Sequence, residues 1–467
     1  MFHLFERLVD PYPDAVPATP PRGFFTFMWA CTVGMRRYIA AMTLFTAGIG
    51  AFEAVLFAML GSIVDWLSHV PRERLWTDER ARLLLLAGIL AASLIMVALQ
   101  STLKQQTLQG NFPMRLRWNF HRLLLRQSLS FYQDEFAGRI ATKVMQTALA
   151  VRDTWMTVCD ILVFIVIYFV TLLAVVGSFH LGMLLPMLGW LALYLLTLRH
   201  FVPRLSRVSK VQADARSLMT GRITDAYTNI ATVKLFAHDR REAAHARSAM
   251  QEFLQTVHAQ MRLVTGFEIV IHALSMVLIL ATAGAALALW MRGEVGVGAV
   301  AAATAMALRL NGISHWIMWE MATLFEHIGT VQDGIGTLSR APTITDAPDA
   351  RALRVERGEI RFEDVSFGYA GGPRVIEHFD LTIRPGEKIG LVGRSGAGKS
   401  TIVNLLLRFH DLPEGSIRID GTDIARVTQD SLRAQVGMVT QDTSLLHRSV
   451  RDNILYGRPD AGDEAMM

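Results

Sequence analysis

The chain is poor in cysteine and in charged residues. Among 467 residues there are only two cysteines, Cys31 and Cys159, and they lie far apart. This excludes a disulfide framework and a zinc site built on cysteine pairs. Charged residues make up 19% of the sequence and hydrophobic residues 52%, whereas soluble domains typically carry about 25% charged residues. The composition is therefore too apolar for an ordinary soluble enzyme.

The sequence also shows no sign of a cleavable signal peptide or of a nucleic acid partner. Residues 1–21 are mixed polar and rich in proline, without the compact apolar core of a signal peptide. The formal net charge is +5, but Lys and Arg are concentrated in segments that flank or join apolar stretches. Positively charged cytoplasmic loops of a membrane protein explain this distribution better than nucleic acid binding does.

Long apolar runs are what the sequence has in abundance. Six of them are long enough to cross the hydrocarbon core of a lipid bilayer as helices. They cover approximately residues 38–64, 83–103, 158–179, 181–202, 267–291 and 297–318. Short loops join the first run to the second, the third to the fourth and the fifth to the sixth. We therefore predict a membrane α-helical bundle of six spans.

The two remaining connections, residues 104–157 and 203–266, are long, basic and amphipathic, and we expect them to be helical. The positive-inside rule places both in the cytoplasm. Arg36 and Arg37, just before the first span, place the N-terminus there too. The loop 71–82 also carries arginines, but it is too short to reverse this orientation.

The sequence outside the spans suggests three further parts. Residues 22–37 hold Phe24, Phe25, Phe27 and Trp29 between arginines, which suits a helix lying in the membrane interface; an extension of the first span is the alternative. We expect the following organisation: a cytoplasmic N-terminus with an interfacial helix (1–37), a six-span domain (38–325), a linker rich in Ala, Pro, Asp and Arg (326–358), and the first part of an α/β domain (359–467).

The sequence pattern of residues 359–467 predicts strands and a helix. Residues 359–369 and 375–383 alternate apolar and polar side chains, as strands with one buried face do. The apolar stretch 388–392 predicts a buried strand, and residues 398–410 predict a helix.

A glycine-rich loop lies between that strand and that helix and satisfies the P-loop (Walker A) pattern G-x-x-x-x-G-K-[ST]. Its residues are Gly393, Arg394, Ser395, Gly396, Ala397, Gly398, Lys399, Ser400 and Thr401. The glycines allow positive φ and a close approach to phosphate oxygens, and successive N–H groups at a helix N-terminus surround the anion. Lys399 would reach the β- and γ-phosphates, and Ser400 would place its hydroxyl on Mg²⁺.

This loop, the spacing of the six spans and the C-terminal nucleotide domain resemble an ATP-binding cassette (ABC) exporter. From about residue 22 onward, the chain is similar to bacterial half-transporters of the lipid and multidrug type, with fused membrane and P-loop NTPase domains. The resemblance implies ATP-driven export of an amphipathic, lipid-like or drug-like small molecule across the bacterial inner membrane. It also implies a second half-transporter chain, in a homo- or heterodimer, and cytoplasmic nucleotide domains.

The resemblance assigns roles to further residues. Residues 131–140 and 225–239 are similar to cytoplasmic coupling segments, which in the family rest on the nucleotide domain; the alternative is that they are only amphipathic connectors. Tyr369 matches the aromatic residue that stacks on adenine, although a tyrosine at the end of a strand is otherwise a packing residue. Gln441 matches the glutamine that reaches Mg²⁺, so the resemblance implies ATP and Mg²⁺ as ligands, with Ser400 and Gln441 on the metal.

Three motifs of the family are absent from these 467 residues. They are the Leu-Ser-Gly-Gly-Gln signature, an apolar strand ending in Asp-Glu, and the switch histidine. We therefore expect no residue here that catalyses hydrolysis. The chain is either a partial copy of an exporter or a truncated membrane subunit that binds ATP without hydrolysing it. Without the missing strand, central strands would expose unpaired N–H and C=O groups.

Charged side chains inside spans are costly and usually face a cavity or one another. The candidates are Glu53, Glu268, His272, Arg309, His315 and Glu320. Arg309, Trp316 and Glu320 share one face of a helix because their spacings are close to whole turns. These side chains either line a translocation cavity for an amphipathic or ionic solute, or they pair with one another or lie near the water boundary.

Overall fold

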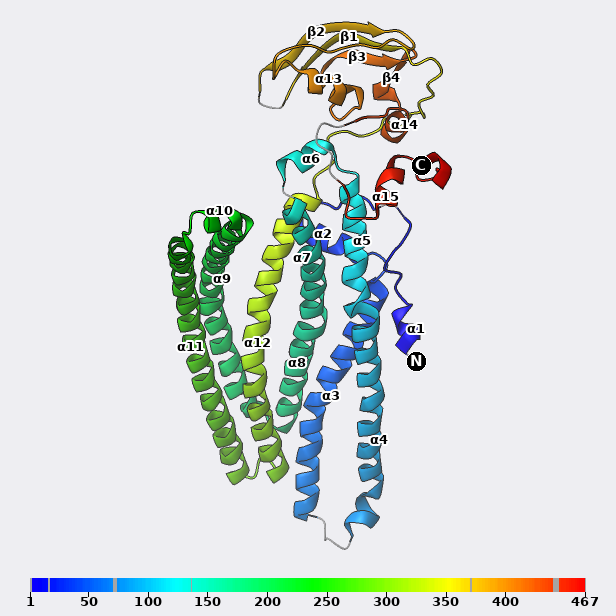
Figure 1. Cartoon of the computed structure of the whole chain (residues 1–467). Coiled ribbons are helices and arrows are strands. Elements are labelled where there is room, and N and C mark those ends of the chain that lie inside the picture. The colour runs from blue at the N-terminus through cyan, green and yellow to red at the C-terminus, as the bar shows by residue number, and fades with distance from the viewer. Residues whose placement is uncertain are drawn as a thin grey trace. The chain divides into compact units, whose positions relative to one another are not determined.

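The structure, a computed structural model, describes residues 2–15, 17–69, 74–135, 137–369, 372–439 and 445–466. The chain divides into two compact units (Figure 1). The first consists of Met1–Arg126 and Phe136–Ala341 and is helical. The second consists of Gln127–Glu135 and Pro342–Met467 and contains the sheet.

The first unit contains six candidate membrane spans among its described residues, as judged by length and apolar composition. They cover Arg36–Ser68, Glu79–Leu125, Gly138–Phe179, Leu181–Thr228, Asp239–Met291 and Val297–Leu338. The helices that build them are α3 (Arg36–His69), α4 (Leu75–Thr102), α5 (Asn111–Leu125), α7 (Ala137–Met156), α8 (Val163–Phe179), α9 (Leu184–Thr228), α11 (Asp239–Met291) and α12 (Val297–Leu338). The six-span prediction is therefore confirmed.

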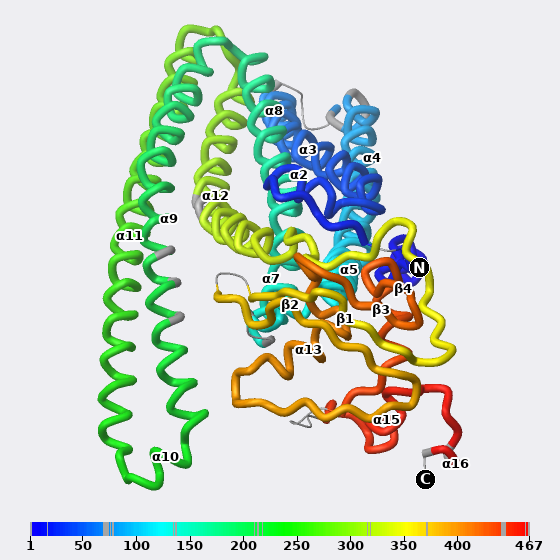
Figure 2. The backbone as a smooth tube through the Cα atoms, turned by 90° about the horizontal axis from the view of Figure 1, so that it is seen from above, coloured from blue at the N-terminus to red at the C-terminus, as the bar shows by residue number. Residues whose placement is uncertain are grey.

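The long basic connectors are continuations of the spans. Two π-helical segments, η1 (Leu103–Gln109) and η2 (Thr157–Leu162), link α4 to α5 and α7 to α8. On the other connector, α9 and α11 run side by side and are joined by the short helix α10 (Ile230–Leu235), as Figure 2 shows. The expectation that these connectors are helical is thus confirmed.

The core of the first unit lies among α8, α9, α11 and α12, with η3 (Leu181–Met183) at one turn. Tyr168, Leu172, Met187 and Leu278 are fully buried there. Between α3 and α12 the backbones come close at Gly61 and Gly298. Such small residues suit membrane helices, which associate through close packing and polar contacts more than through the hydrophobic effect.

The N-terminal segment lies along η1 and α5. After α1 (Phe2–Glu6), the carbonyl of Asp10 accepts a hydrogen bond from Arg115 at 2.8 Å, and that of Pro13 accepts one from Arg122 at 2.7 Å. The aromatic helix α2 (Phe24–Ala30) is separated from α3 by a turn at residues 31–35, so it does not extend the first span. Its position in the membrane interface stays a prediction.

The second unit is built on a four-stranded antiparallel sheet with the order β2-β1-β3-β4. Its strands are β1 (Ile360–Gly368), β2 (Arg374–Ile383), β3 (Glu414–Ile419) and β4 (Thr422–Asp423). The helical elements are α6 (Leu129–Asp134), α13 (Lys399–Leu406), η4 (Ile424–Arg426), α14 (Gln429–Ala434), α15 (Val450–Ile454), η5 (Leu455–Gly457) and α16 (Asp463–Met466). Phe362, Val365, Leu405 and Ile417 form the centre of its core. The predicted strands at 359–369 and 375–383 are confirmed.

The prediction of a buried strand at residues 388–392 is wrong. This stretch has no regular secondary structure, and Val392 is 99% exposed. The physical reason is that no strand lies beside it among the described residues. Without neighbours its N–H and C=O groups stay unpaired and its apolar side chains uncovered. The predicted helix at 398–410 is shorter, because it ends at Leu406 and Arg408 adopts a positive φ of 49°.

Residues that precede β1 form hydrogen bonds with other parts of the second unit. Arg408, which is 5% exposed, donates to the carbonyls of Thr345 and Val427 at 3.1 and 3.2 Å. Ser431 accepts from the N–H of Leu353 at 2.8 Å. The segment 326–358 therefore contains the end of α12 and a stretch packed on the sheet domain.

Candidate nucleotide-binding site

Two of the three glycines of the loop adopt the predicted positive φ, and Gly393 does not. Gly396 and Gly398 adopt φ values of +83° and +84°, a region that side chains with a Cβ rarely enter. A Cβ on Gly398 would also lie 3.2 Å from Cγ1 of Val375 on β2. Gly398 is therefore required both by its conformation and by the close approach of β2.

Helix α13 begins directly after this loop, at Lys399. Its N-cap is Gly398, which has no side chain to accept hydrogen bonds from the first N–H groups of the helix. Those groups and the positive end of the helix suit an anion such as a phosphate. The loop therefore fits the phosphate chain of a nucleotide.

The ammonium group of Lys399 lies over the loop. Its Nζ donates hydrogen bonds to the carbonyls of Gly393 and Arg394, at 2.8 and 2.9 Å. These contacts keep the positive charge at the loop, where it would meet phosphate oxygens. Arg394, Ser395 and Ser400 are exposed on the same loop and at the start of α13.

Tyr369, the predicted adenine-stacking residue, is brought to the same loop. Tyr369 is the residue directly after β1. Its hydroxyl lies 3.2 Å from Oγ1 of Thr401 on α13. The side chain also contacts the rings of Phe367 and His410, and the residue is 41% exposed. Gln441, the other residue assigned by resemblance, lies outside the described residues.

His410 was not predicted as a member of this site. It follows the end of α13 and is 41 positions from Tyr369 in the sequence, so no local spacing rule connects the two. Burial lowers the pKa of its imidazole. Only the fold brings this ring to Tyr369.

Of the two predicted Mg²⁺ ligands, Ser400 and Gln441, the structure describes Ser400. No group of three or more His, Cys, Asp or Glu side chains suited to a metal ion occurs among the described residues. Mg²⁺ in phosphate sites is usually held by few protein ligands together with phosphate oxygens and water. The exposed hydroxyl of Ser400 fits this arrangement, and its role stays a prediction.

Glu53, Arg309 and Glu320, three of the candidate side chains in the spans, have hydrogen-bond partners. Arg309 donates to Glu53 at 2.8 Å, and Nε1 of Trp316 donates to Glu320 at 3.0 Å. Pairing, one of the alternatives to a cavity, is therefore found for Arg309 and Glu53. Glu268 and His272 are exposed on α11. A translocation cavity lined by such residues stays a prediction.

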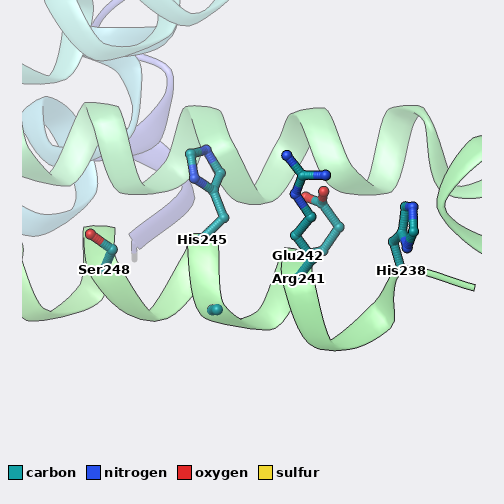
Figure 3. A pocket seen from close by; sticks show the side chains of 6 residues that line it. His238, Arg241, Glu242, His245 and Ser248 are labelled. Atoms are coloured by element: carbon teal, nitrogen blue, oxygen red, sulfur yellow. The ribbon is translucent and has the colours of Figure 1, made fainter.

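A separate open hollow lies at the beginning of α11. It is lined by His238, Arg241, Glu242, His245 and Ser248 together with Ala244. Figure 3 shows the side chains of Arg241, Glu242 and His245 on the first turns of this helix and that of His238 at its beginning. Most of these residues are exposed, so we regard the hollow as part of a solvated polar face.

The two parts of the chain match two known families. Residues 39–313 match the ABC transporter transmembrane region, and residues 376–466 match the ABC transporter domain. The fold is also that of a solved protein, a bacterial Atm1-family ABC exporter with ATP bound. That likeness has a TM-score of 0.75 at 24% sequence identity and covers 92% of this chain and 75% of that chain.

Curated proteins give the same result. An uncharacterized ABC transporter ATP-binding protein of Haemophilus influenzae is 56% identical over 467 residues, which is the whole of this chain and 76% of the relative. A fatty acid ABC transporter ATP-binding/permease protein of Mycobacterium tuberculosis is 30% identical over 399 residues, 82% of this chain and 60% of the relative. This chain belongs to the ABC transporter family, with a transmembrane region and an ATP-binding domain fused in one polypeptide.

Proposed function

We propose that this chain is one half of a dimeric ABC exporter that uses ATP to move an amphipathic, lipid-like or drug-like solute across a membrane. The observation that carries the proposal is the glycine loop with α13, in a chain that also has six candidate spans. The name of the mycobacterial relative, a fatty acid transporter, supports a solute with an apolar chain.

In this proposal the residues of the loop hold the nucleotide. The N–H groups of residues 393–401 surround the phosphates, Lys399 neutralises the β- and γ-phosphates, and Ser400 and Gln441 hold Mg²⁺. Tyr369 stacks on the adenine ring. The bound metal would neutralise phosphate charge, while the chain's own groups fix the position of the nucleotide.

The partner and the location follow from the same reading. We propose a second half-transporter chain, identical or different, and a bacterial inner membrane with the N-terminus and the nucleotide domain in the cytoplasm. The basic residues of the two long connectors support this orientation. We also propose the domain boundaries 1–37, 38–325, 326–358 and 359–467.

A second candidate is a membrane subunit that binds ATP without hydrolysing it. It requires only the glycine loop with α13 and the six candidate spans. The two candidates agree on ATP binding and differ in hydrolysis and transport.

The test uses inside-out membrane vesicles that contain the full chain, with a lipophilic fluorescent dye and a fluorescently tagged phospholipid as probes. The exporter proposal predicts ATP-dependent uptake of at least one probe, and loss of that uptake in Lys399→Ala. ATP binding without ATP hydrolysis or uptake would support the second candidate instead. Absence of ATP binding would contradict both.

A further inference from the structure

Three aromatic rings meet beside the glycine loop. The Tyr369 and Phe367 centroids are 5.2 Å apart with an angle of 82° between the planes, and those of Tyr369 and His410 are 5.3 Å apart at 90°. Phe367 and His410 also contact each other at 5.3 Å. Phe367 comes from β1, whereas His410 follows α13, so this cluster joins the sheet to the helix of the loop.

These contacts fix the ring of Tyr369 and leave it open to a ligand. Its hydroxyl lies 3.2 Å from Oγ1 of Thr401, and its two ring neighbours meet it at nearly right angles. Neither of these two neighbours lies parallel to it. Because Tyr369 is 41% exposed, a flat base has room to stack on it. A stacking platform works best when its ring is already held in place.

His410 makes its contribution through packing. Its Nε2 atom is buried and has no hydrogen-bond partner among the described residues, and burial lowers the pKa of the ring. The imidazole is therefore neutral at neutral pH and acts as an aromatic neighbour. Aromatic pairs in such geometry stabilise each other beyond the area they bury, and an aromatic replacement of His410 would preserve that contact.

We propose that His410 is a positioning residue that holds Tyr369 in the orientation that stacks on the base of a purine nucleotide. This inference rests on the proposed role of Tyr369 in binding adenine. In this proposal His410 touches no ligand and acts only through Tyr369. The cluster also contains Phe367, but Phe367 belongs to the core of the sheet, whereas His410 is half-buried at its edge.

The experiment compares two ligands on the full chain in lipid nanodiscs, MgATP and inorganic tripolyphosphate, by titration calorimetry. Tripolyphosphate engages the glycine loop without a base. We expect His410→Ala to weaken MgATP binding by about two- to tenfold and to leave tripolyphosphate binding unchanged. His410→Phe should restore MgATP binding to within about twofold of the unmodified chain.

A double-mutant cycle completes the test. In a Tyr369→Ala background, His410→Ala should cause no further loss of MgATP affinity. Three results would overturn the inference and leave the proposed function standing. They are a further loss of affinity in the double mutant, equal losses of affinity for both ligands in His410→Ala, and no effect of His410→Ala where Tyr369→Ala does weaken MgATP binding. If Tyr369→Ala itself does not weaken MgATP binding relative to tripolyphosphate, the role of Tyr369 fails and the inference fails with it.

Discussion

The carboxylate of Asp160 accepts a hydrogen bond from Nζ of Lys104 at 2.6 Å. Asp160 is in η2 of the third span and is 6% exposed, and Lys104 is in η1 of the second span. The same carboxylate accepts from Thr46 on α3 at 2.6 Å and from Gln100 on α4 at 2.9 Å. One buried carboxylate therefore joins the first three spans.

Removing Lys104 should destabilise this part of the bundle. Lys104→Met leaves Asp160 as a buried carboxylate without its cation, a change that costs about 3–5 kcal/mol in a fully buried pair. Because the Lys104 side chain is 30% exposed, we expect about 2–3 kcal/mol. The measurement is the thermal unfolding midpoint in nanodiscs, followed by tryptophan fluorescence. Adding Asp160→Asn should recover part of the loss, because it removes the uncompensated charge.

The matched control is Lys234→Met. Lys234 pairs with Asp239 at 3.1 Å, but both side chains are more than half exposed, at 66% and 62%. Such a pair contributes about 0–1 kcal/mol, so the midpoint should hardly move. Equal shifts for Lys104→Met and Lys234→Met would show that the buried pair has no special role.

A methyl group at Gly298 should separate α3 from α12. A Cβ at this position would lie 2.6 Å from Cγ of Asp65, and the carbonyl oxygen of Gly61 is in the way as well. The N–H of Gly298 also donates to Oδ1 of Asp65 at 2.7 Å. We expect Gly298→Ala to lower stability by about 1–3 kcal/mol, measured as a lower unfolding midpoint.

Gly312 offers a control on the same helix. Apart from its chain neighbours and the nearby backbone of α12, no described atom lies within 4 Å of the Cβ that an alanine would place there. Gly312→Ala should therefore be neutral or stabilise α12 by up to about 1 kcal/mol, because alanine favours helix more than glycine does. A loss of stability as large as that of Gly298→Ala would contradict the close-packing account.

Asp420 should make the sheet domain sensitive to acid. Its carboxylate accepts from the N–H groups of Arg357, Gly358, Glu359 and Glu356, at 2.9, 3.2, 2.9 and 2.8 Å. These donors, with Arg357 first, hold the pKa of Asp420 well below its usual range. A lowered folded-state pKa means that the stabilisation is present above the unfolded value of about 3.9. It is lost as the pH falls from there through the lower folded-state pKa.

Hydrogen exchange of the amides of residues 356–359 measures this effect. Asp420→Asn should weaken their protection at pH 7, and the difference from the unmodified chain should shrink below about pH 4. Asp460→Asn, at an exposed position, serves as the control. Protection that is the same in Asp420→Asn and in the unmodified chain at pH 7 would refute the assignment.

The features that could be predicted from the sequence are those set by local pattern. Apolar runs of membrane length predicted the spans, alternation predicted β1 and β2, and glycine spacing predicted the loop before Lys399. Each depends on residues that are neighbours in the chain. The backbone conformation of Gly396 and Gly398 then follows from the absence of a Cβ.

What could not be predicted depends on contacts across the chain. The pairing of Lys104 with Asp160 joins residues 56 positions apart, and hydropathy gives no sign of the π-helical turns that carry them. The contact of His410 with Tyr369 joins residues 41 positions apart. The prediction of a strand at 388–392 is wrong for the same reason. An apolar run forms a strand only where neighbouring strands pair with it.

The central claim is that the glycine loop binds ATP, and equilibrium binding of MgATP to the full chain in nanodiscs tests it most directly. We predict saturable binding that Lys399→Ala weakens by about 10- to 100-fold, the effect of losing a charged hydrogen-bond donor. Lys388→Ala, at an exposed lysine before the loop, should bind as the unmodified chain does. No saturable binding, or equal affinity in the unmodified chain and in Lys399→Ala, would contradict the account.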